Sequence, residues 1–449
     1  MTTLRTEVCF TGVRLAEKCG QESSPVQHNG RPARRRWRSL PSCSRQGLLF
    51  DGRQVDATRD QPPAVLHVVT RYQRGGSERR IRDSILALPG VRHHLVLGRE
   101  SDLELAREQT AAERVWIMPT LVREVSPIRD LLALASLWRL LRGRTYAAVI
   151  THQSKAGILT RVAAAVSRIP AVHSLSMASF GPGYGRLESL LFRRLERVLG
   201  GRTAGYCVVG ADLARQFSDI GVPAERLHVV RSGVPLPARV RSREEARQLL
   251  KERYRIDPGR RQVCFVGSLE PRKNPLLLPR LLRELSDRLP DPPGLLVIGD
   301  GPLRSRLVET LREVGVEDQA VLTGYLADPR LVHDALRGVD VVVLLSDAEG
   351  LPQVLVQSAA AGTPFVAFDV EGVREILSLG ARGSAVPHGS LDEVVDAVAG
   401  WLTAVPSAPL EPVADLTSWS PEVIAGSYRR VIGGVLPAVR PSDQQASGY

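Results

Sequence analysis

The sequence predicts an α/β protein built from parallel β-sheets, and three observations carry that prediction. Short apolar runs alternate with amphipathic segments of helical length along most of the chain, which is typical of right-handed βαβ units. The run at residues 339–345 is almost entirely apolar, as expected of a strand that is buried on both faces. The chain has 449 residues, enough for two or three domains.

The elements follow from these patterns in chain order. In the first half, apolar runs predict strands at residues 64–69, 95–97, 114–118, 146–150, 206–209 and 226–230. Amphipathic spacing predicts helices from residue 77, at 127–141, at 185–199 and from 211. In the second half, strands are expected at 262–266, 295–298 and 339–345, and helices at 244–254, 390–402 and 419–435. A segment rich in Pro and Arg, 235–241, is the expected linker between the halves.

Composition and charge limit the functional classes. The chain is 43% hydrophobic and 24% charged, which is ordinary for a globular protein, and it lacks a run of eighteen apolar residues. We expect no secretory signal, and the five cysteines match no zinc or redox spacing, so reduced thiols in a cytoplasmic protein are expected. The net charge of +12 suits anionic partners, but no nucleic-acid-binding signature accompanies it, so no nucleic-acid partner is expected.

Two segments each allow two interpretations. Residues 1–60 contain a run of arginines without sustained periodicity, which predicts a disordered basic extension; a basic arm for nucleic acid or membrane is the alternative. The helix at 185–199 carries leucines at helical spacing and several arginines. We expect its apolar side to pack on the sheet with a solvated charged face, and contact with an anionic membrane is the alternative.

The loop that carries the strongest candidate site residue follows the strand at 339–345. It carries Glu349 and Gly350, and Pro352 then opens a helix, where its missing N–H costs nothing. Ligands of open α/β sheets bind at the carboxyl ends of strands, and a carboxylate there can accept hydrogen bonds from several sugar hydroxyls. A plain helix-entry carboxylate that is favoured by the helix dipole is the other interpretation of Glu349.

Loops after other strands also carry polar groups. Gly75 and Gly76 follow the first strand, where paired glycines allow backbone N–H groups to approach a phosphate, although many tight βα turns contain them. His152 ends the strand near residue 150 and either contacts a substrate or only caps its loop. Arg272 and Lys273 follow the strand at 262–266 and are either a phosphate site or a solvated turn.

Taken together, these segments resemble, in the same order, the retaining nucleotide-sugar-dependent glycosyltransferases of family 4 (glycosyl transferases group 1), which include sucrose, trehalose and phosphatidylinositol mannosyl transferases. The resemblance covers residues 64–438. It rests on the first-loop glycines, on the His-x-Ser-Lys-Ala-Gly passage from His152, on the Gly267 loop with Lys273, and on the signature that begins at Glu349.

The resemblance implies a GT-B fold, in which two Rossmann-like, doubly wound parallel-sheet domains face a cleft. Residues 61–235 would form the acceptor-side domain and residues 236–415 the donor-nucleotide domain. Residues 416–449 would contribute a helix that crosses back to the first domain, followed by a polar tail.

The resemblance also implies roles for single residues. Glu349 would hold the transferred sugar, and Lys273 with Arg272 would bind the donor diphosphate. The expected donor-side residues are Gly75, Gly76, Gly267, Ser268, Tyr325, Leu326, Gly350, Leu351, Pro352 and Gln357, and the acceptor-side residues are His152, His173 and Ser176. Relatives usually carry Arg at position 268, Glu at 357 and His at 176. No metal or other cofactor is expected.

The implied activity is transfer of a sugar from a nucleoside diphosphate sugar to a hydroxyl of a lipid-linked, glycan or small-molecule acceptor. Cell-envelope glycan, glycolipid or secondary-metabolite synthesis would use it, in the cytoplasm or peripherally at the inner face of the membrane. A nucleotide-sugar 2-epimerase shares the architecture, and a non-catalytic sugar-nucleotide-binding protein would explain the departures at Ser176, Ser268 and Gln357. A Rossmann dehydrogenase is disfavoured, because no Gly-x-Gly-x-x-Gly follows the first strand.

Overall fold

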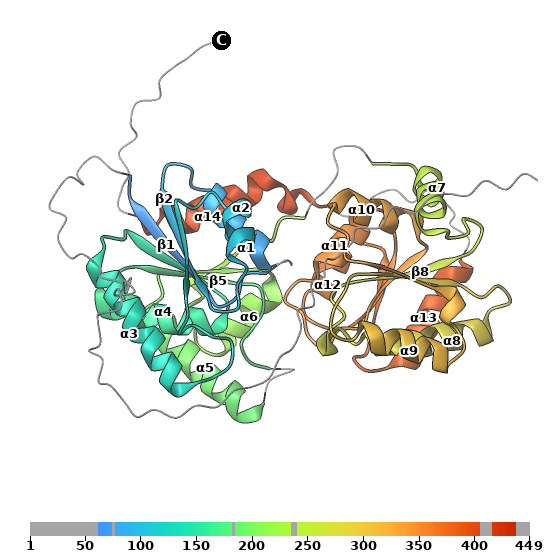
Figure 1. The fold of residues 1–449 in the computed structure, drawn as a ribbon, viewed down its shortest axis with the longest axis horizontal. Coiled ribbons are helices and arrows are strands. Elements are labelled where there is room, and N and C mark those ends of the chain that lie inside the picture. The colour runs from blue at the N-terminus through green and yellow to red at the C-terminus, as the bar shows by residue number, and fades with distance from the viewer. Residues whose placement is uncertain (1–61, 74–76, 182–184, 235–239, 405–414, 437–449) are drawn as a thin grey trace, which may run out of the picture. The chain divides into compact units, whose positions relative to one another are not determined.

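The computed structural model describes residues 62–73, 77–181, 185–234, 240–404 and 415–436 (Figure 1). The predicted basic extension at 1–60, the pair Gly75 and Gly76, most of the linker and the polar tail lie outside the described residues. Two parallel sheets are present in the described chain, so the predicted fold class of two Rossmann-like α/β domains is confirmed.

The first sheet has seven strands among the described residues, in the order β3-β2-β1-β4-β5-β6-β7, all parallel. The strands are β1 Ala64–Val69, β2 Arg92–Gly98, β3 Arg114–Met118, β4 Ala148–His152, β5 Ala171–Leu175, β6 Gly205–Val208 and β7 Leu227–Val229. From β1 the chain continues to β2 and β3 on one side in the sheet, and from β4 it continues to β5, β6 and β7 in the opposite direction. The crevice between the carboxyl ends of β1 and β4 is therefore the topological switch point of this sheet.

Helices cover both faces of the first sheet (Figure 1). One face carries α1 Ser77–Leu86, α2 Leu103–Gln109 and α14 Pro421–Gly433; the other carries α3 Pro127–Gly143, α4 Ser154–Ser167, α5 Arg186–Gly200 and α6 Ala211–Asp219. The last helix packs on strands from the first half of the chain, since Ile424, Tyr428 and Ile432 share an apolar cluster with Val65 and Cys207.

The second sheet has six parallel strands among the described residues, in the order β10-β9-β8-β11-β12-β13. The strands are β8 Gln262–Val266, β9 Gly294–Ile298, β10 Ala320–Gly324, β11 Val341–Leu344, β12 Phe365–Phe368 and β13 Gly383–Val386. One face is covered by α8 Leu278–Arg288, α9 Arg304–Glu313 and α13 Leu391–Thr403, and the other by α7 Arg243–Tyr254, α10 Pro329–Gly338, α11 Gln353–Ala360 and α12 Val373–Ser378. Its switch point lies between β8 and β11.

The expected packing of the 185–199 helix is wrong for most of its length. Leu187, at 85% exposure, and Leu190, Leu191 and Val198 point away from the protein, and the helix is buried through Glu196 and Leu199. Successive helical residues are about 100° apart, so Glu196, nine positions after Leu187, lies about half a turn round the helix. The leucine stripe therefore faces outward.

A buried ion pair decides this orientation. The guanidinium of Arg161 on α4 donates to Glu196 at 2.6 Å and to the hydroxyl of Tyr206 at 2.7 Å, and both charged side chains are buried. A buried carboxylate needs such partners to offset its lost hydration. The orientation that pairs Glu196 with Arg161 is therefore more stable than one that would bury the leucines and leave Glu196 unpaired.

No helix in the described ranges is both long enough and apolar enough to span a bilayer.

Candidate active site

Two loops at the switch point of the second sheet bring together an anion and two cations. Lys273 and Arg272 lie in the loop after β8, and Glu349 lies in the loop after the neighbouring strand β11. The ammonium of Lys273 forms an ion pair with Glu349 Oε1, and Arg272 Nη1 lies 3.4 Å from the same oxygen. The Glu349 side chain is only 11% exposed. The structure thus brings together the three residues predicted to be catalytic.

The two loops are braced by hydrogen bonds that the sequence did not predict. Arg272 Nη1 donates to the carbonyl of Ala348 at 2.6 Å, and Asp347 N donates to the carbonyl of Arg272 at 2.9 Å. Asn274 Nδ2 donates to Asp347 Oδ1 at 2.6 Å and to the carbonyl of Leu345 at 3.0 Å. Asn274 adopts a left-handed backbone with φ of 48°, which asparagine tolerates better than most residues. Cross-bracing of this kind holds charged groups in place before a ligand binds.

The electrostatics keep Glu349 ionised. Burial alone would raise the pKa of Glu349, but the charges of Lys273 and then Arg272 outweigh burial and lower the pKa below its ordinary value. A carboxylate with a lowered pKa stays charged near pH 7. The cluster combines two cations with one carboxylate, so a net positive charge remains for an anionic ligand.

The other predicted donor-side residues surround this cluster unevenly. Leu351 and Pro352 are buried, with Pro352 directly before α11, while Gln357 is half-buried within α11. Ser268 and Leu326 are also half-buried, and Tyr325 is 55% exposed after β10. Gly267 lies close to Gly299, where an added Cβ would lie 1.9 Å from the Gly267 carbonyl, so only glycine fits at position 299.

The predicted acceptor-side residues separate into three environments. Ser176 approaches the donor loop, because a Cβ at Gly350 would lie 1.7 Å from the Ser176 carbonyl. His173 lies in the core, where Thr151 Oγ1 is 2.7 Å from its Nδ1 and its ring fills the space above Gly157. His152 is buried at the carboxyl end of β4, with Nε2 3.2 Å from His67 Nδ1. Of the three, only His173 is enclosed by the core on the α4 side of the sheet.

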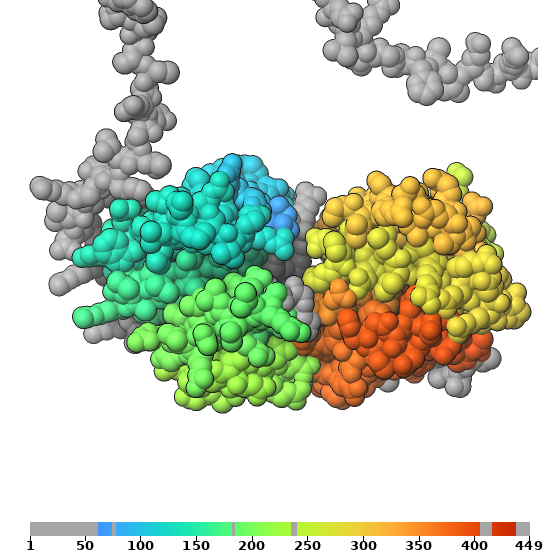
Figure 2. Space-filling view, turned by 90° about the horizontal axis from the view of Figure 1, so that it is seen from below, coloured from blue at the N-terminus to red at the C-terminus, as the bar shows by residue number. Residues whose placement is uncertain are grey.

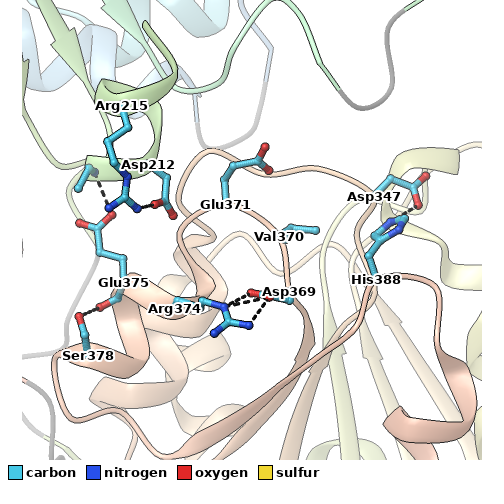
Figure 3. A pocket seen from close by; sticks show the side chains of 11 residues that line it. Asp212, Arg215, Asp347, Asp369, Val370, Glu371, Arg374, Glu375, Ser378 and His388 are labelled. Carbon is cyan, nitrogen blue, oxygen red and sulfur yellow. Dashed lines mark hydrogen bonds and ion pairs between the residues drawn. The ribbon is translucent and has the colours of Figure 1, made fainter. Parts of the chain in front are cut away.

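A cavity of about 730 Å³ adjoins the braced loops (Figure 3). It is lined by polar and charged side chains from α6, from the segment around α12 and from the ends of β11 and β13: Asp212, Arg215, Asp347, Asp369, Glu371, Arg374, Glu375, Ser378 and His388. His388 Nε2 lies 3.2 Å from Asp347 Oδ1, which links the cavity to the Asn274 brace. Glu349 and Lys273 do not line it, so the cavity neighbours the charge cluster without containing it.

Sequence reasoning missed Asn274, Asp347 and His388. Asp347 stands two positions before Glu349 and Asn274 directly after Lys273, so their nearness to predicted site residues was a usable signal. His388 follows β13, a strand that neighbours β12 rather than β11, and only the sheet order places it near Asp347.

Comparison with known protein families yields two matches. Residues 246–408 match the family of glycosyl transferases group 1, and residues 75–233 match the glycosyl transferase 4-like domain. The first match covers the whole second sheet with the charge cluster, and the second covers every strand of the first sheet except β1.

Individual proteins are similar as well. The chain is 27% identical over 291 residues to the UDP-Gal:α-D-GlcNAc-diphosphoundecaprenol α-1,3-galactosyltransferase of Escherichia coli, covering 64% of this chain and 74% of that protein. It is 31% identical to a GDP-mannose-dependent phosphatidylinositol monomannoside mannosyltransferase of Mycobacterium tuberculosis, covering 46% of this chain and 54% of that protein. The crystal structure of Anabaena HepE with UDP and glucose has the same fold, with a TM-score of 0.67 at 17% identity, over 83% of this chain and 99% of that one.

Proposed function

Since this chain belongs to the glycosyltransferases that join a 4-like domain to a group 1 domain, we propose that it moves a sugar from a nucleoside diphosphate sugar to an acceptor hydroxyl with retained anomeric configuration. One observation carries the proposal: Lys273, Arg272 and Glu349 converge at the switch point of the second sheet. Ligands of doubly wound sheets bind at that position, and the charges there match a diphosphate beside a polyhydroxylated ring.

The proposed step follows the charges. The bond between the anomeric carbon and the diphosphate oxygen breaks, which leaves negative charge on the diphosphate and an oxocarbenium-like sugar. Lys273 and Arg272 stabilise the departing anion, and Glu349 orients the sugar hydroxyls. The acceptor hydroxyl forms the new bond on the same face of the sugar, and its proton passes to the departing phosphate oxygen. We propose no obligatory metal, because the two cations supply the charge stabilisation.

The test is a screen of nucleoside diphosphate sugars by thermal shift, since a bound donor raises the melting temperature by mass action. Donors that bind are then incubated with and without acceptor, with and without EDTA, and the product anomer is identified by NMR. Transfer with retention in EDTA is expected. Conversion of donor alone to a C2 epimer would indicate the epimerase, and binding with hydrolysis no faster than in buffer would indicate a non-catalytic binding protein.

We predict that Lys273→Ala weakens binding of the nucleoside diphosphate by about 1.5–3 kcal/mol, the scale of a charge-assisted hydrogen bond. The measurement is calorimetric titration with the diphosphate of the donor found in the screen. Lys251→Ala is the control, because Lys251 is an exposed lysine of α7 in the same domain. Equal affinity in wild type and Lys273→Ala would show that the loop after β8 does not hold phosphate.

We also propose that the acceptor is presented at an anionic membrane surface. Exposed apolar side chains occur near the starts of both α3 and α5, and we call this set the α3–α5 surface: Val125, Ile128, Leu131, Leu132, Leu187, Leu190 and Leu191. Both helices begin after the carboxyl ends of strands, so their starts lie at the same edge of the first sheet. They belong to the helical layer that faces the viewer in Figure 2.

The charges beside this surface favour an anionic bilayer as its partner. Arg186, Arg193, Arg194 and Arg197 are exposed on the same helix. Arg186, Arg193 and Arg197 fall together on one flank of the leucine stripe, and Arg194 lies within it. An apolar stripe with a basic flank is the pattern of a helix that lies in a membrane interface. The names of the Escherichia coli and Mycobacterium tuberculosis relatives include lipid-linked acceptors, which supports the same proposal for this chain.

We therefore expect the protein to float with vesicles that contain phosphatidylglycerol, and to bind phosphatidylcholine vesicles much more weakly. The double variant Leu187→Gln/Leu191→Gln should lose most of this binding, since each leucine inserted into the interface contributes on the order of 1 kcal/mol. The control is Val166→Gln, because Val166 is 67% exposed near the far end of α4, in the same helical layer. Binding that is equal in the double variant and the control would refute the membrane role of the α3–α5 surface.

A further inference from the structure

Three buried histidines form a hydrogen-bonded chain across the first sheet. His93 Nε2 lies 3.0 Å from the carbonyl oxygen of Leu88, His93 Nδ1 lies 3.0 Å from His67 Nε2, and His67 Nδ1 lies 3.2 Å from His152 Nε2. The rings of His67 and His152 are stacked, with an angle of 10° between their planes. All three side chains are buried, and they belong to β2, β1 and β4, which are neighbours in the sheet. We call this set the histidine relay.

Each imidazole of the relay is neutral near pH 7. Burial, then the charges of His93 and His152, holds the pKa of His67 well below its ordinary value, and burial also lowers the pKa of His93. Burial, followed by the charge of Arg80, lowers the pKa of His152 to about 3. Among the described residues, the groups whose charges are coupled to His152 are Arg80 on α1, His67 on β1 and His173 on β5, and none of these three is an acid that would favour an imidazolium.

Neutrality and the carbonyl at one end fix every proton in the relay. A carbonyl oxygen only accepts, so His93 Nε2 carries the hydrogen and His93 Nδ1 is bare. His67 must then donate from Nε2 to His93, which leaves His67 Nδ1 bare. His152 must donate from Nε2 to His67, so its Nδ1 has no hydrogen. Within the described chain, this last nitrogen makes no hydrogen bond.

The bare nitrogen belongs to a residue at the switch point of the first sheet. His152 is the last residue of β4 and pairs in register with Val69, the last residue of β1. The next residue, Gln153, has a φ of 63° and bonds through its amide to both backbone groups of Arg71, at 3.1 Å and 2.9 Å. The ends of β1 and β4 are thus tied together on either side of the crevice where such sheets bind ligands.

We propose that His67 and His93 are positioning residues that hold His152 as its Nε2–H tautomer, so that His152 Nδ1 accepts a hydrogen bond from a sugar or polyol hydroxyl at the β1–β4 switch point. The proposal deepens the proposed function, because it assigns to the first domain the group that orients the acceptor. A partner that hydrogen-bonds one ring nitrogen, and so fixes the tautomer in which the other nitrogen acts, is a recurring arrangement around functional histidines.

The first test needs no ligand. Long-range ¹⁵N–¹H NMR of the full chain at pH 7 should show His152 protonated at Nε2 and bare at Nδ1. His67→Leu removes the acceptor for the Nε2 hydrogen and should give a mixture of tautomers, whereas His67→Asn can still accept that hydrogen through its amide oxygen and should restore the single tautomer. A wild-type His152 that is protonated at Nδ1, or is a cation, would overturn the relay whatever the enzyme transfers.

The second test uses hydroxyl probes. Methyl α-glucoside, methyl α-N-acetylglucosaminide and myo-inositol are each titrated into labelled protein, and at least one should shift the His152 Nδ1 signal, with loss of that response in His67→Leu. The matched control is His94→Leu, because His94 is also buried in β2 but binds Tyr146 on the other face of the sheet. With the tautomer as predicted but no response to any probe, the ligand role of His152 would be wrong. Failure of sugar transfer alone would count against the proposed function and not against the relay.

Discussion

Sugar transfer by a Glu349→Ala variant should fall by a factor on the order of 10² or more, because the group proposed to orient the transferred sugar is lost. The structure adds a second reason. Lys273 and Arg272 both lie against Glu349 Oε1, so alanine also releases the two cations that we propose to bind the diphosphate. We expect kcat to fall more than donor affinity, since two unpaired cations still attract the diphosphate. Single-turnover transfer and calorimetric donor binding separate the two effects.

Glu349→Gln is the informative companion to that variant. The amide keeps the shape and one acceptor oxygen but loses the charge that Lys273 pairs with. Its transfer rate should lie between those of wild type and alanine. Because the pKa of Glu349 is lowered in the folded protein, the stability that its charge contributes is present above the ordinary carboxyl pKa. That stability is lost as the pH falls through the lowered pKa. Wild-type turnover by both variants would remove Glu349 from the site.

The largest expected effect on stability comes from Glu196→Ala. This change leaves the buried guanidinium of Arg161 without its carboxylate, and breaking a buried pair by removing one partner typically costs about 3–5 kcal/mol. Burial would lower the pKa of Arg161, but Glu196 and then Tyr206 outweigh burial and raise it. Hydrogen exchange at the amides of β4, β5 and β6 measures the change in opening free energy directly.

A double variant distinguishes the loss of an ion pair from the loss of packing. Arg161→Met/Glu196→Leu removes both charges and keeps apolar volume, and such replacements are often neutral or stabilising. We expect it to exchange far more slowly than Glu196→Ala alone. If both variants open equally easily, the packing of α4 against α5 rather than the ion pair supports this part of the sheet.

Local patterns in the sequence were sufficient for the fold and for the charge cluster. Strand β1 was predicted with the observed limits, and Lys273 and Glu349 were placed in loops that meet, because parallel strands bring their carboxyl ends to one edge. The predictions that failed were those that depend on contacts between residues far apart in the sequence. The leucines of α5 alone predict burial, and only the contact of Glu196 with Arg161, 35 residues away along the chain, turns them outward. The histidine relay was not predicted from the sequence for the same reason, since His67 and His152 are 85 positions apart.

The packing of α14 on the first sheet also determines when that sheet can finish folding during translation. A ribosome completes all seven strands of that sheet about two hundred residues before it reaches Pro421. Until Ile424, Tyr428 and Ile432 emerge, Val65, Val172 and Cys207 have no helix from that end of the chain to cover them. The domain made first is therefore the last to be closed, and a nascent chain carries this open apolar face through the whole translation of the second domain.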